Sequence, residues 1–335
     1  MLPKYLTAIA VAISAAVALS PDTARANCDT GETTIKLSHV VAASGHPKGD
    51  AATAFAAAVN SELNGRICVE VYPNSTLYDD DKVLEAMLLG DVQMAAPSLS
   101  KMEKYTKRFR IFDLPFLFRD AESVYEFQDS AAGAELARSV EDKGLLMLGY
   151  WPNGMKQMSA NKPLVSPEDA SGLKFRIQSS EVLQAQFEAL DASPQKLAFK
   201  EVYGALQTGV VDGQENTYSN IYTKKFFEVQ DGLTESNHGI LTYGVVTSTE
   251  FWNSLSAQDR GDLERILARV TSESRASAKA SNLSAKENII SSGGTVRTLT
   301  AAQRNAWVNA MRPVWDQFSD DIGSDLIESA SSFSN

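Results

Sequence analysis

Residues 67–96 read ICVEVYPNSTLYDDDKVLEAMLLGDVQMAA, and this stretch decides the fold class. Ile67 to Tyr72 is rich in β-branched residues and ends before a proline, which predicts a strand. Asp80 to Leu89 begins with acidic residues and is followed by a glycine, which predicts a short helix. Val92 to Ala96 predicts a second strand, so the stretch is a strand–helix–strand unit of a parallel α/β sheet.

The residues before this stretch extend the same pattern. Thr34 to Val40 alternates as a strand does, and residues 55–63 place their apolar side chains on one helical face. Ligands of such sheets bind beyond the carboxyl ends of the strands. The loops at 41–49 and 97–101 are therefore expected at a binding mouth.

The second half of the chain repeats this order and predicts a second, similar lobe. The expected elements are a strand at 145–150, a crossover at 151–154, a strand at 174–178, helices at 182–190 and 200–208, a strand at 210–212, a loop at 213–220 and a strand at 240–247.

A long helix is expected near the end of the chain. Ser256 to Asp259 resembles a capping-box start, and after Val270 neither proline nor glycine appears until Gly293. A helix over about 257–291 would be about 50 Å long, which exceeds one lobe, so we expect it to span both. The predicted division gives 27–150 plus about 239–275 to the first lobe, and 151–238 plus about 276–335 to the second.

The N-terminus has the form of a signal peptide. Lys4 precedes an apolar run from Leu6 to Leu19, and Ala24-Arg25-Ala26 offers a cleavage site. The apolar run is too short to span about 30 Å of hydrocarbon. We expect residues 1–26 to be removed after Ala26 and the mature protein to be periplasmic.

Composition excludes several classes of function. The net charge is −11, whereas nucleic acids and anionic membranes need basic surfaces. The only two cysteines, Cys28 and Cys68, predict a disulfide in an oxidising compartment, with two buried free thiols as the alternative. The three histidines lack metal-ligand spacing, and no nucleophile or phosphate-loop motif is present. We expect a binding protein without a cofactor, not an enzyme.

Arg176 is the first candidate for ligand binding. It is central in a predicted strand between Phe175 and Ile177, where a charge is costly unless it is paired. Its planar guanidinium matches a carboxylate through two hydrogen bonds. A structural ion pair with an internal carboxylate is the alternative.

Further candidates lie in the predicted loops and at strand ends. An acidic neighbour of Asn216, Glu215, would repel an anionic ligand unless it holds an arginine. The other candidates are Lys48, Ser98, Trp151, Asn153, Gln178, Asn216 and Tyr218.

Seven motifs, in this order, resemble those of the binding subunits of tripartite ATP-independent periplasmic (TRAP) transporters, specifically the four-carbon dicarboxylate-binding group. The resemblance covers nearly all of the mature chain. The motifs are His46-Pro47-Lys48-Gly49, residues 71–75, 96–100 and 113–116, Tyr150 to Gly154, Gly172 to Ser180, and Leu206 to Asn216.

The resemblance implies an α/β, two-lobed fold like that of periplasmic binding proteins, each lobe a mostly parallel sheet flanked by helices. It also implies that Arg176 clamps a carboxylate with help from Asn216, and that Lys48, Ser98, Trp151 and Asn153 match positions lining the site. Pro152 and Thr217 depart from the family pattern beside proposed contacts.

The resulting hypothesis is a hinged trap for a dicarboxylate such as succinate, malate or fumarate. Arg176 and Asn216 would hold one carboxylate and Lys48 and Ser98 the other, before delivery to the membrane subunits of the transporter. The alternatives are a keto, aromatic or sugar acid in the same fold, a periplasmic component that presents its ligand to a sensor, and a hydrolase.

Overall fold

The computed structural model describes residues 28–334. The predicted signal peptide and its cleavage site lie outside these residues. Within them, every helix is either too short or too polar to cross a bilayer.

The first of two sheets contains the strands expected from the opening stretch. Its order is β2-β1-β3-β10-β4, and β1 is parallel to both β2 and β3. β10 is antiparallel to both of its neighbours, so the sheet is mostly parallel with one reversed strand. Its strands are β1 (Thr33–Ser38), β2 (Ile67–Tyr72), β3 (Met94–Ala95), β4 (Leu145–Met155) and β10 (Ile240–Ser248).

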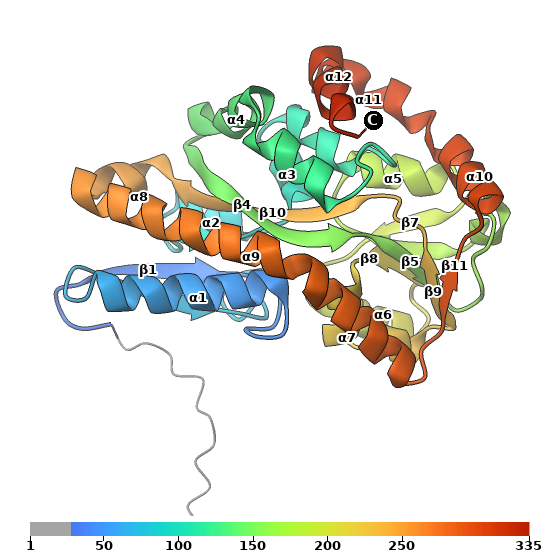
Figure 1. The fold of residues 1–335 in the computed structure, drawn as a ribbon, viewed down its shortest axis with the longest axis horizontal. Coiled ribbons are helices and arrows are strands. Elements are labelled where there is room, and N and C mark those ends of the chain that lie inside the picture. Colours follow the sequence, from blue (N-terminus) through green and yellow to red (C-terminus); the bar gives the residue numbers. More distant parts are fainter. Residues whose placement is uncertain (1–27, 335) are drawn as a thin grey trace, which may run out of the picture.

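The second sheet has the order β11-β9-β5-β8-β6-β7 and again contains one reversed strand, β5. The two sheets, with helices on their faces, confirm the predicted two-lobed α/β architecture (Figure 1). The strands are β5 (Gln157–Ala160), β6 (Lys174–Ile177), β7 (Ser193–Lys196), β8 (Gly213–Asn216), β9 (Gly232–Glu235) and β11 (Val296–Thr298).

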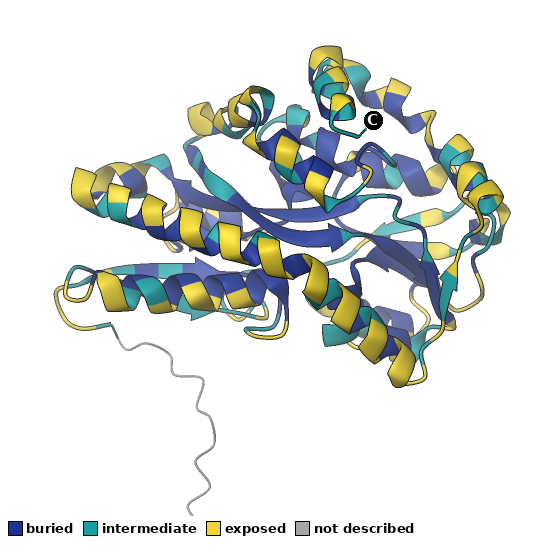
Figure 2. Cartoon of the chain, viewed as in Figure 1, coloured by how far each residue is buried: buried dark blue, intermediate teal, exposed yellow. Residues whose placement is uncertain are grey.

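The helices cover both sheets and turn their apolar faces inward (Figure 2). Their bounds are α1 (Pro47–Glu62), α2 (Val83–Leu88), α3 (Ala121–Asp129), α4 (Ala131–Arg138), α5 (Glu181–Glu188), α6 (Val202–Gln207), α7 (Tyr218–Thr223), α8 (Thr249–Ser254), α9 (Ala257–Ser291), α10 (Ala301–Met311), α11 (Val314–Ile322) and α12 (Ser324–Ser332).

The chain crosses between the sheets at three places. β4 runs into β5, the segment after β9 leads into β10, and α9 lies along both halves of the molecule (Figure 1). α9 contacts α1 and β4 on one side and α7 on the other. Ser256 caps it by accepting a hydrogen bond from the Asp259 backbone N–H, as the capping pattern indicated.

Three element predictions were wrong. Lys48 lies in the first turn of α1, because Pro47 begins that helix and the His46 side chain accepts a hydrogen bond from the Lys48 backbone N–H. Residues 151–154 continue β4 instead of forming a separate crossover. The strand expected at 210–212 begins at Gly213, because Gln214 pairs with Arg176, and the expected loop contains β8 and α7.

The last two helices attach to the first half of the molecule. Trp315 and Phe318 of α11 and Leu326 of α12 share an apolar cluster with Phe112 and Phe127. Residues from about 276 to 335 were expected in the second lobe, whereas these contacts join α11 and α12 to elements of the predicted first lobe.

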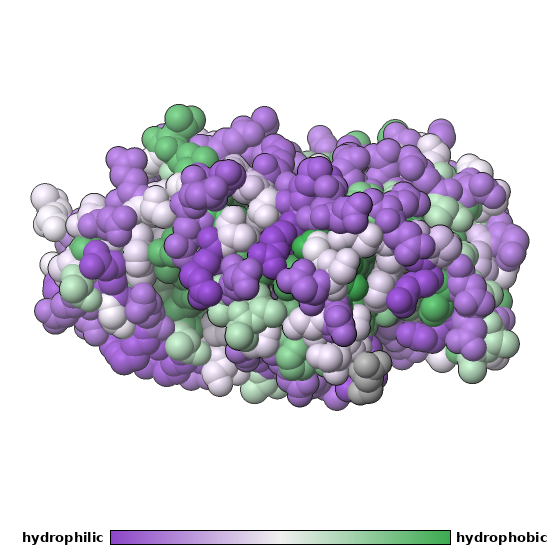
Figure 3. Space-filling view, turned by 90° about the horizontal axis from the view of Figure 1, so that it is seen from above, coloured by the Kyte–Doolittle hydropathy of each residue, from purple (hydrophilic) through white to green (hydrophobic). Residues whose placement is uncertain are grey.

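The surface is mainly hydrophilic on the face shown in Figure 3. Few large apolar side chains are exposed among the described residues, and most lie at helix ends or on the outer face of α9. They are Leu88, Leu89, Val210, Leu283 and Ile290.

Cys28 and Cys68 form a disulfide, which ties the start of the described chain to β2. We expect reduction to lower the free energy of unfolding by about 3–4 kcal/mol, because the unfolded chain regains the entropy of a large loop. The two cysteines are 40 residues apart. Urea unfolding with and without reductant measures the effect, and Cys28→Ser/Cys68→Ser serves as a control that reductant does not shift. An unchanged midpoint after verified reduction would contradict the expectation.

Candidate functional site

A cavity lies between the two sheets, with an empty volume of about 400 Å³ that is partly open to solvent. Its first wall comes from the first sheet and its loops, and its second wall from the second sheet. The first wall contains Val40, Val41, Asp80, Asp81, Ser98, Lys101, Leu241 and Tyr243, and the second wall contains Arg176, Gln178, Phe199, Asn216 and Asn220.

Arg176 presents a buried guanidinium on the second wall. Its Nε and Nη2 donate hydrogen bonds of 3.0 and 2.8 Å to the Leu197 carbonyl oxygen. No carboxylate within residues 28–334 lies within ion-pair distance of it. Burial lowers the pKa of Arg176 to about 10, so the group stays charged at neutral pH. An internal ion pair, the alternative considered from sequence, is thus not what holds this charge.

Asn216 lines the second wall together with Arg176 and is fixed by a chain of amide hydrogen bonds. Its Oδ1 accepts a 2.6 Å bond from Asn220 Nδ2, and its Nδ2 donates a 2.7 Å bond to Gln214. Thr217, which departs from the family pattern, caps α7 by accepting a hydrogen bond from the Asn220 backbone N–H. The departure therefore preserves the position of Asn216 and Asn220.

His46 connects this amide chain to the first wall. Its Nε2 lies 2.6 Å from Asn220 Oδ1, and its Nδ1 accepts a hydrogen bond from the Lys48 backbone N–H. Because the amide oxygen can only accept, the ring is in the neutral Nε2–H form. Burial lowers the pKa of His46 to about 3, which keeps the ring neutral.

Lys48 lies behind the first wall and does not line the cavity. Its Nζ donates a 2.9 Å hydrogen bond to the Ala96 carbonyl and lies 3.7 Å from the centroid of the Tyr243 ring, which does line it. Burial lowers the pKa of Lys48 to about 8, although the charge of Asp80 opposes this shift. Lys48 is thus a buried cation close to the cavity, and no carboxylate in the described part of the chain forms an ion pair with it.

The first wall also contains charged residues that the sequence analysis missed. Lys101 Nζ lies 2.7 Å from Asp81 Oδ1, and Ser98 donates its backbone N–H to Asp80. Asp81 also accepts a 2.9 Å hydrogen bond from Ser179, which belongs to the other side of the cavity. The two sides of the cavity are therefore in contact through Asp81 and Ser179. The signal for Lys101 was its place in the loop at 97–101, whereas Asp80 and Asp81 had been expected in a helix that in fact begins at Val83.

Ser98 and Gln178 line the cavity from opposite walls, as their positions at strand ends suggested. Asn153 lies behind it, where its Nδ2 donates a 2.8 Å hydrogen bond to the Tyr243 hydroxyl. Asn153 thus supports the wall from behind. Tyr243 and Asn220 were not predicted, because their roles depend on contacts between distant parts of the chain.

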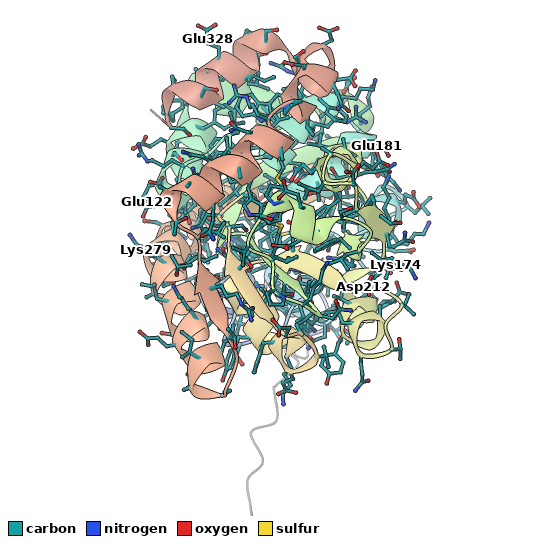
Figure 4. All side chains as sticks on the ribbon, turned by 90° about the vertical axis from the view of Figure 1, so that its right-hand side faces the viewer. Glu122, Lys174, Glu181, Asp212, Lys279 and Glu328 are labelled. Atoms are coloured by element: carbon teal, nitrogen blue, oxygen red, sulfur yellow. A yellow bond between two sulfur atoms is a disulfide. The ribbon has the colours of Figure 1, made fainter. Side chains whose placement is uncertain are left out.

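Trp151 and Tyr218 do not line the cavity. Trp151 is fully buried in the apolar cluster of the first sheet, edge-to-face with Phe55. Tyr218 faces a groove between α3 and α9 on another side of the molecule, where its hydroxyl donates to Glu235. Glu122 and Lys279, labelled at one edge in Figure 4, line the same groove. The structure therefore gives neither Trp151 nor Tyr218 access to a ligand in the cavity.

The chain is similar in sequence and in structure to known proteins of one family. The sequence profile of the bacterial extracellular solute-binding proteins, family 7 (DctP), matches residues 37–321. The C4-dicarboxylate-binding periplasmic protein DctP of Vibrio cholerae is 57% identical over 98% of both chains.

Two solved structures of TRAP periplasmic solute-binding proteins share the fold. The protein from Shewanella oneidensis, with bound succinate, is 48% identical, covers 91% of this chain and 100% of its own, and has a TM-score of 0.89. The protein from Pseudomonas aeruginosa, with bound L-malate, is 45% identical, covers 85% and 99%, and has a TM-score of 0.83. This chain belongs to family 7 of the bacterial extracellular solute-binding proteins.

Proposed function

We propose that this protein captures a four-carbon dicarboxylate such as succinate or malate and delivers it to the membrane subunits of a TRAP transporter. Arg176 is the observation that carries the proposal. A buried guanidinium on the wall of a cavity, with no carboxylate of the described residues within ion-pair distance, is costly unless a ligand anion completes it. The diacids bound by the two solved relatives have this chemistry.

Arg176 would hold one carboxylate through the guanidinium edge that does not bind Leu197, while Asn216 contributes its amide. The second carboxylate would lie against the first wall, where Lys101 offers an ammonium next to Ser98. Lys48 would act on this carboxylate from behind Tyr243, through its charge. A dianion that touches both walls stabilises the closed form by its higher affinity for that form.

The proposal includes binding without turnover. His46, which is hydrogen-bonded to Asn220 of the cavity wall, is neutral, and each of its ring nitrogens has a hydrogen-bond partner. The cavity lining contains Ser98, but no histidine beside it. Proteins of this family are solute-binding components of transport systems.

We also propose the lobe division predicted from the sequence, with α11 and α12 attached to the first lobe because they pack there. Removal of residues 1–26 after Ala26 would release the protein into the periplasm. The intact mass of the exported protein measures the cleavage position, and a mass that retains the leader would contradict it.

Calorimetric titration of the refolded, ligand-free protein tests the ligand class. We expect one-to-one binding of succinate, fumarate or malate, with butyrate and a sugar acid at least about 100-fold weaker, because a monoacid leaves one cation unpaired and a sugar acid adds hydroxyls. Butyrate matches the carbon number of succinate and removes one charge. Silence toward every diacid, or equal affinity for butyrate, would refute the dicarboxylate proposal and leave the fold assignment intact.

A further inference from the structure

Four buried titratable side chains meet where the chain crosses between the two sheets. Lys156 stands between β4 and β5, and His238 stands in the segment that leads from β9 to β10. Glu215 lies on β8, and Asp113 ends a short 3-10 helix, Lys107–Asp113. None of the four is more than 3% exposed. Asp113 begins one of the motifs, residues 113–116, that the binding site does not use.

Lys156 is the centre of this cluster. Its Nζ lies 3.0 Å from Glu215 Oε2 and 3.8 Å from Asp113 Oδ1. His238 Nε2 lies 3.5 Å from the same Glu215 oxygen, and its Nδ1 lies 2.8 Å from the Ser236 hydroxyl. Glu215 therefore pairs with a lysine, not with the arginine that the sequence analysis considered.

Glu215 and Asp113 share the ammonium of Lys156, but their pKa values are shifted in opposite directions. Burial would raise the pKa of Glu215, but Lys156 and His238 hold it below its usual value. Burial raises the pKa of Asp113, and the charge of Glu215 adds to this, against Lys156 and the hydroxyls of Ser100 and Ser180. Glu215 is thus the charged partner of Lys156, and Asp113 is more easily protonated.

Each carboxylate is connected to one wall of the cavity. On the first wall, Ser98 Oγ donates to Ser100 Oγ over 3.3 Å, and Ser100 Oγ donates to Asp113 Oδ1 over 2.8 Å. On the second wall, Glu215 directly precedes Asn216 on β8. Neighbouring side chains of a strand point to opposite faces, so the cluster holds the backbone of β8 from behind the sheet at Glu215, next to Asn216 in front of it.

Backbone and side-chain contacts hold the cluster at the joint between the sheets. The Lys156 N–H donates to the Gly239 carbonyl, and the Phe116 N–H donates to the His238 carbonyl, both over 2.8 Å. Gln186 of α5 donates its side-chain amide to the Asp113 carbonyl. Both crossing segments and both walls therefore converge on Lys156.

We propose that Lys156 is a positioning residue for ligand capture. It holds the carboxylates of Asp113 and Glu215 behind Ser98 and Asn216, so that each wall of the cavity is placed to contact one end of a bound dianion. This inference rests on the proposed function. It assigns a role to Asp113, Glu215 and His238, which do not touch the cavity.

Three variants test the proposal with the diacid that the wild type binds most tightly among succinate, fumarate and malate. Lys156→Met/Glu215→Gln removes a charge pair together and should weaken binding about tenfold or more. Ser100→Ala breaks the link to Ser98 and should weaken it about fivefold, and Ser100→Thr, which keeps the hydroxyl, should recover most of the affinity. Arg297→Met is the matched control, because it breaks the ion pair with Asp231 at the edge strand β11 of the same sheet.

All affinities are measured at a temperature where each variant is fully folded, so a loss of stability alone does not change them. Should the double variant fail to fold, Asp113→Asn replaces it, because the amide keeps the carboxyl's shape. Affinities of the variants within twofold of the wild type would overturn the proposal.

Hydrogen exchange of the ligand-free protein separates this inference from the proposed function. We expect the cluster variants to lose protection at residues 98–104 and 213–216 together, while Arg297→Met keeps it. Unchanged protection in both segments would overturn the positioning role even if no diacid binds the wild type. If the cluster variants lose protection but the wild type binds no diacid, the dicarboxylate proposal is refuted and the positioning role of Lys156 is supported.

Discussion

Replacing Arg176 by methionine should lower the affinity for a diacid about a thousandfold, the largest effect expected of any single change in the cavity. Truncating one partner of a buried, hydrogen-bonded charge pair costs roughly 2–5 kcal/mol or more, and about 4 kcal/mol corresponds to a thousandfold. The ligand carboxylate would then lie in the cavity without its cation. Calorimetric titration of Arg176→Met measures the loss.

Two further variants distinguish the role of Arg176 from a general effect of charge. Arg176→Lys keeps the charge but loses the planar fork, so we expect binding about tenfold or more weaker than in the wild type. Lys174→Met removes a positive charge from the exposed end of the same strand, labelled in Figure 4, and should leave binding unchanged. Loss of affinity in Lys174→Met as large as in Arg176→Met would contradict a specific clamp.

Affinity for a diacid should decrease as the pH rises through about 8, because burial lowers the pKa of Lys48 to about 8. A bound dianion favours the charged ammonium of Lys48. Above this pH Lys48 is neutral in the ligand-free protein, so it must take up a proton when the ligand binds, and this cost lowers the affinity. Titrations at pH 7, 8 and 9 measure the decrease. Arg176, with a pKa of about 10, stays charged over this range. Lys48→Met should bind more weakly at pH 7 and show almost no dependence on pH.

The stability of the ligand-free protein should change in the opposite direction. The pKa of Lys48 is lower in the folded protein than the ordinary lysine value of 10.5, so the unfolded chain holds the extra proton between about pH 8 and 10.5. The folded state therefore gains stability with rising pH in this window, up to about 3 kcal/mol from this residue. Urea unfolding at pH 7.5 and 9.5 tests this, and Lys48→Met should reduce the gain. A gain as large in Lys48→Met as in the wild type would show that Lys48 is not its source.

Some features follow from the sequence because they depend on residues close together in the chain. The strand–helix–strand order of residues 67–96 specifies a parallel sheet, since each element carries its own apolar pattern and turn residues. The start of α9 at Ala257 follows from the cap at Ser256, and its length follows from the lack of proline. Arg176 could be singled out because a charge between apolar strand residues needs a partner.

Other features depend on which distant segments the fold brings together. The sequence near 210–216 contains two β-branched valines, yet β8 begins at Gly213 because the pairing of Gln214 with Arg176 sets its register. A strand alternates its side chains, so this register decides that Asn216 lines the cavity while Glu215 lies behind it. No local pattern contains this information.

The partners of the buried polar groups are also not contained in any local sequence pattern. Lys156 and Glu215 are 59 residues apart, and His46 and Asn220 are 174 apart, yet each pair is in contact inside the protein. A lysine or glutamate is expected at the surface when only the sequence is known, and a histidine is expected to be only partly buried. Only the folded structure supplies the partners that make burial of these groups tolerable, because buried charges and dipoles are stable only where hydrogen-bonding groups surround them. The two-lobed architecture and the choice of Arg176 as the candidate clamp thus follow from local sequence patterns, whereas the residues that surround and position Arg176 depend on contacts between distant segments.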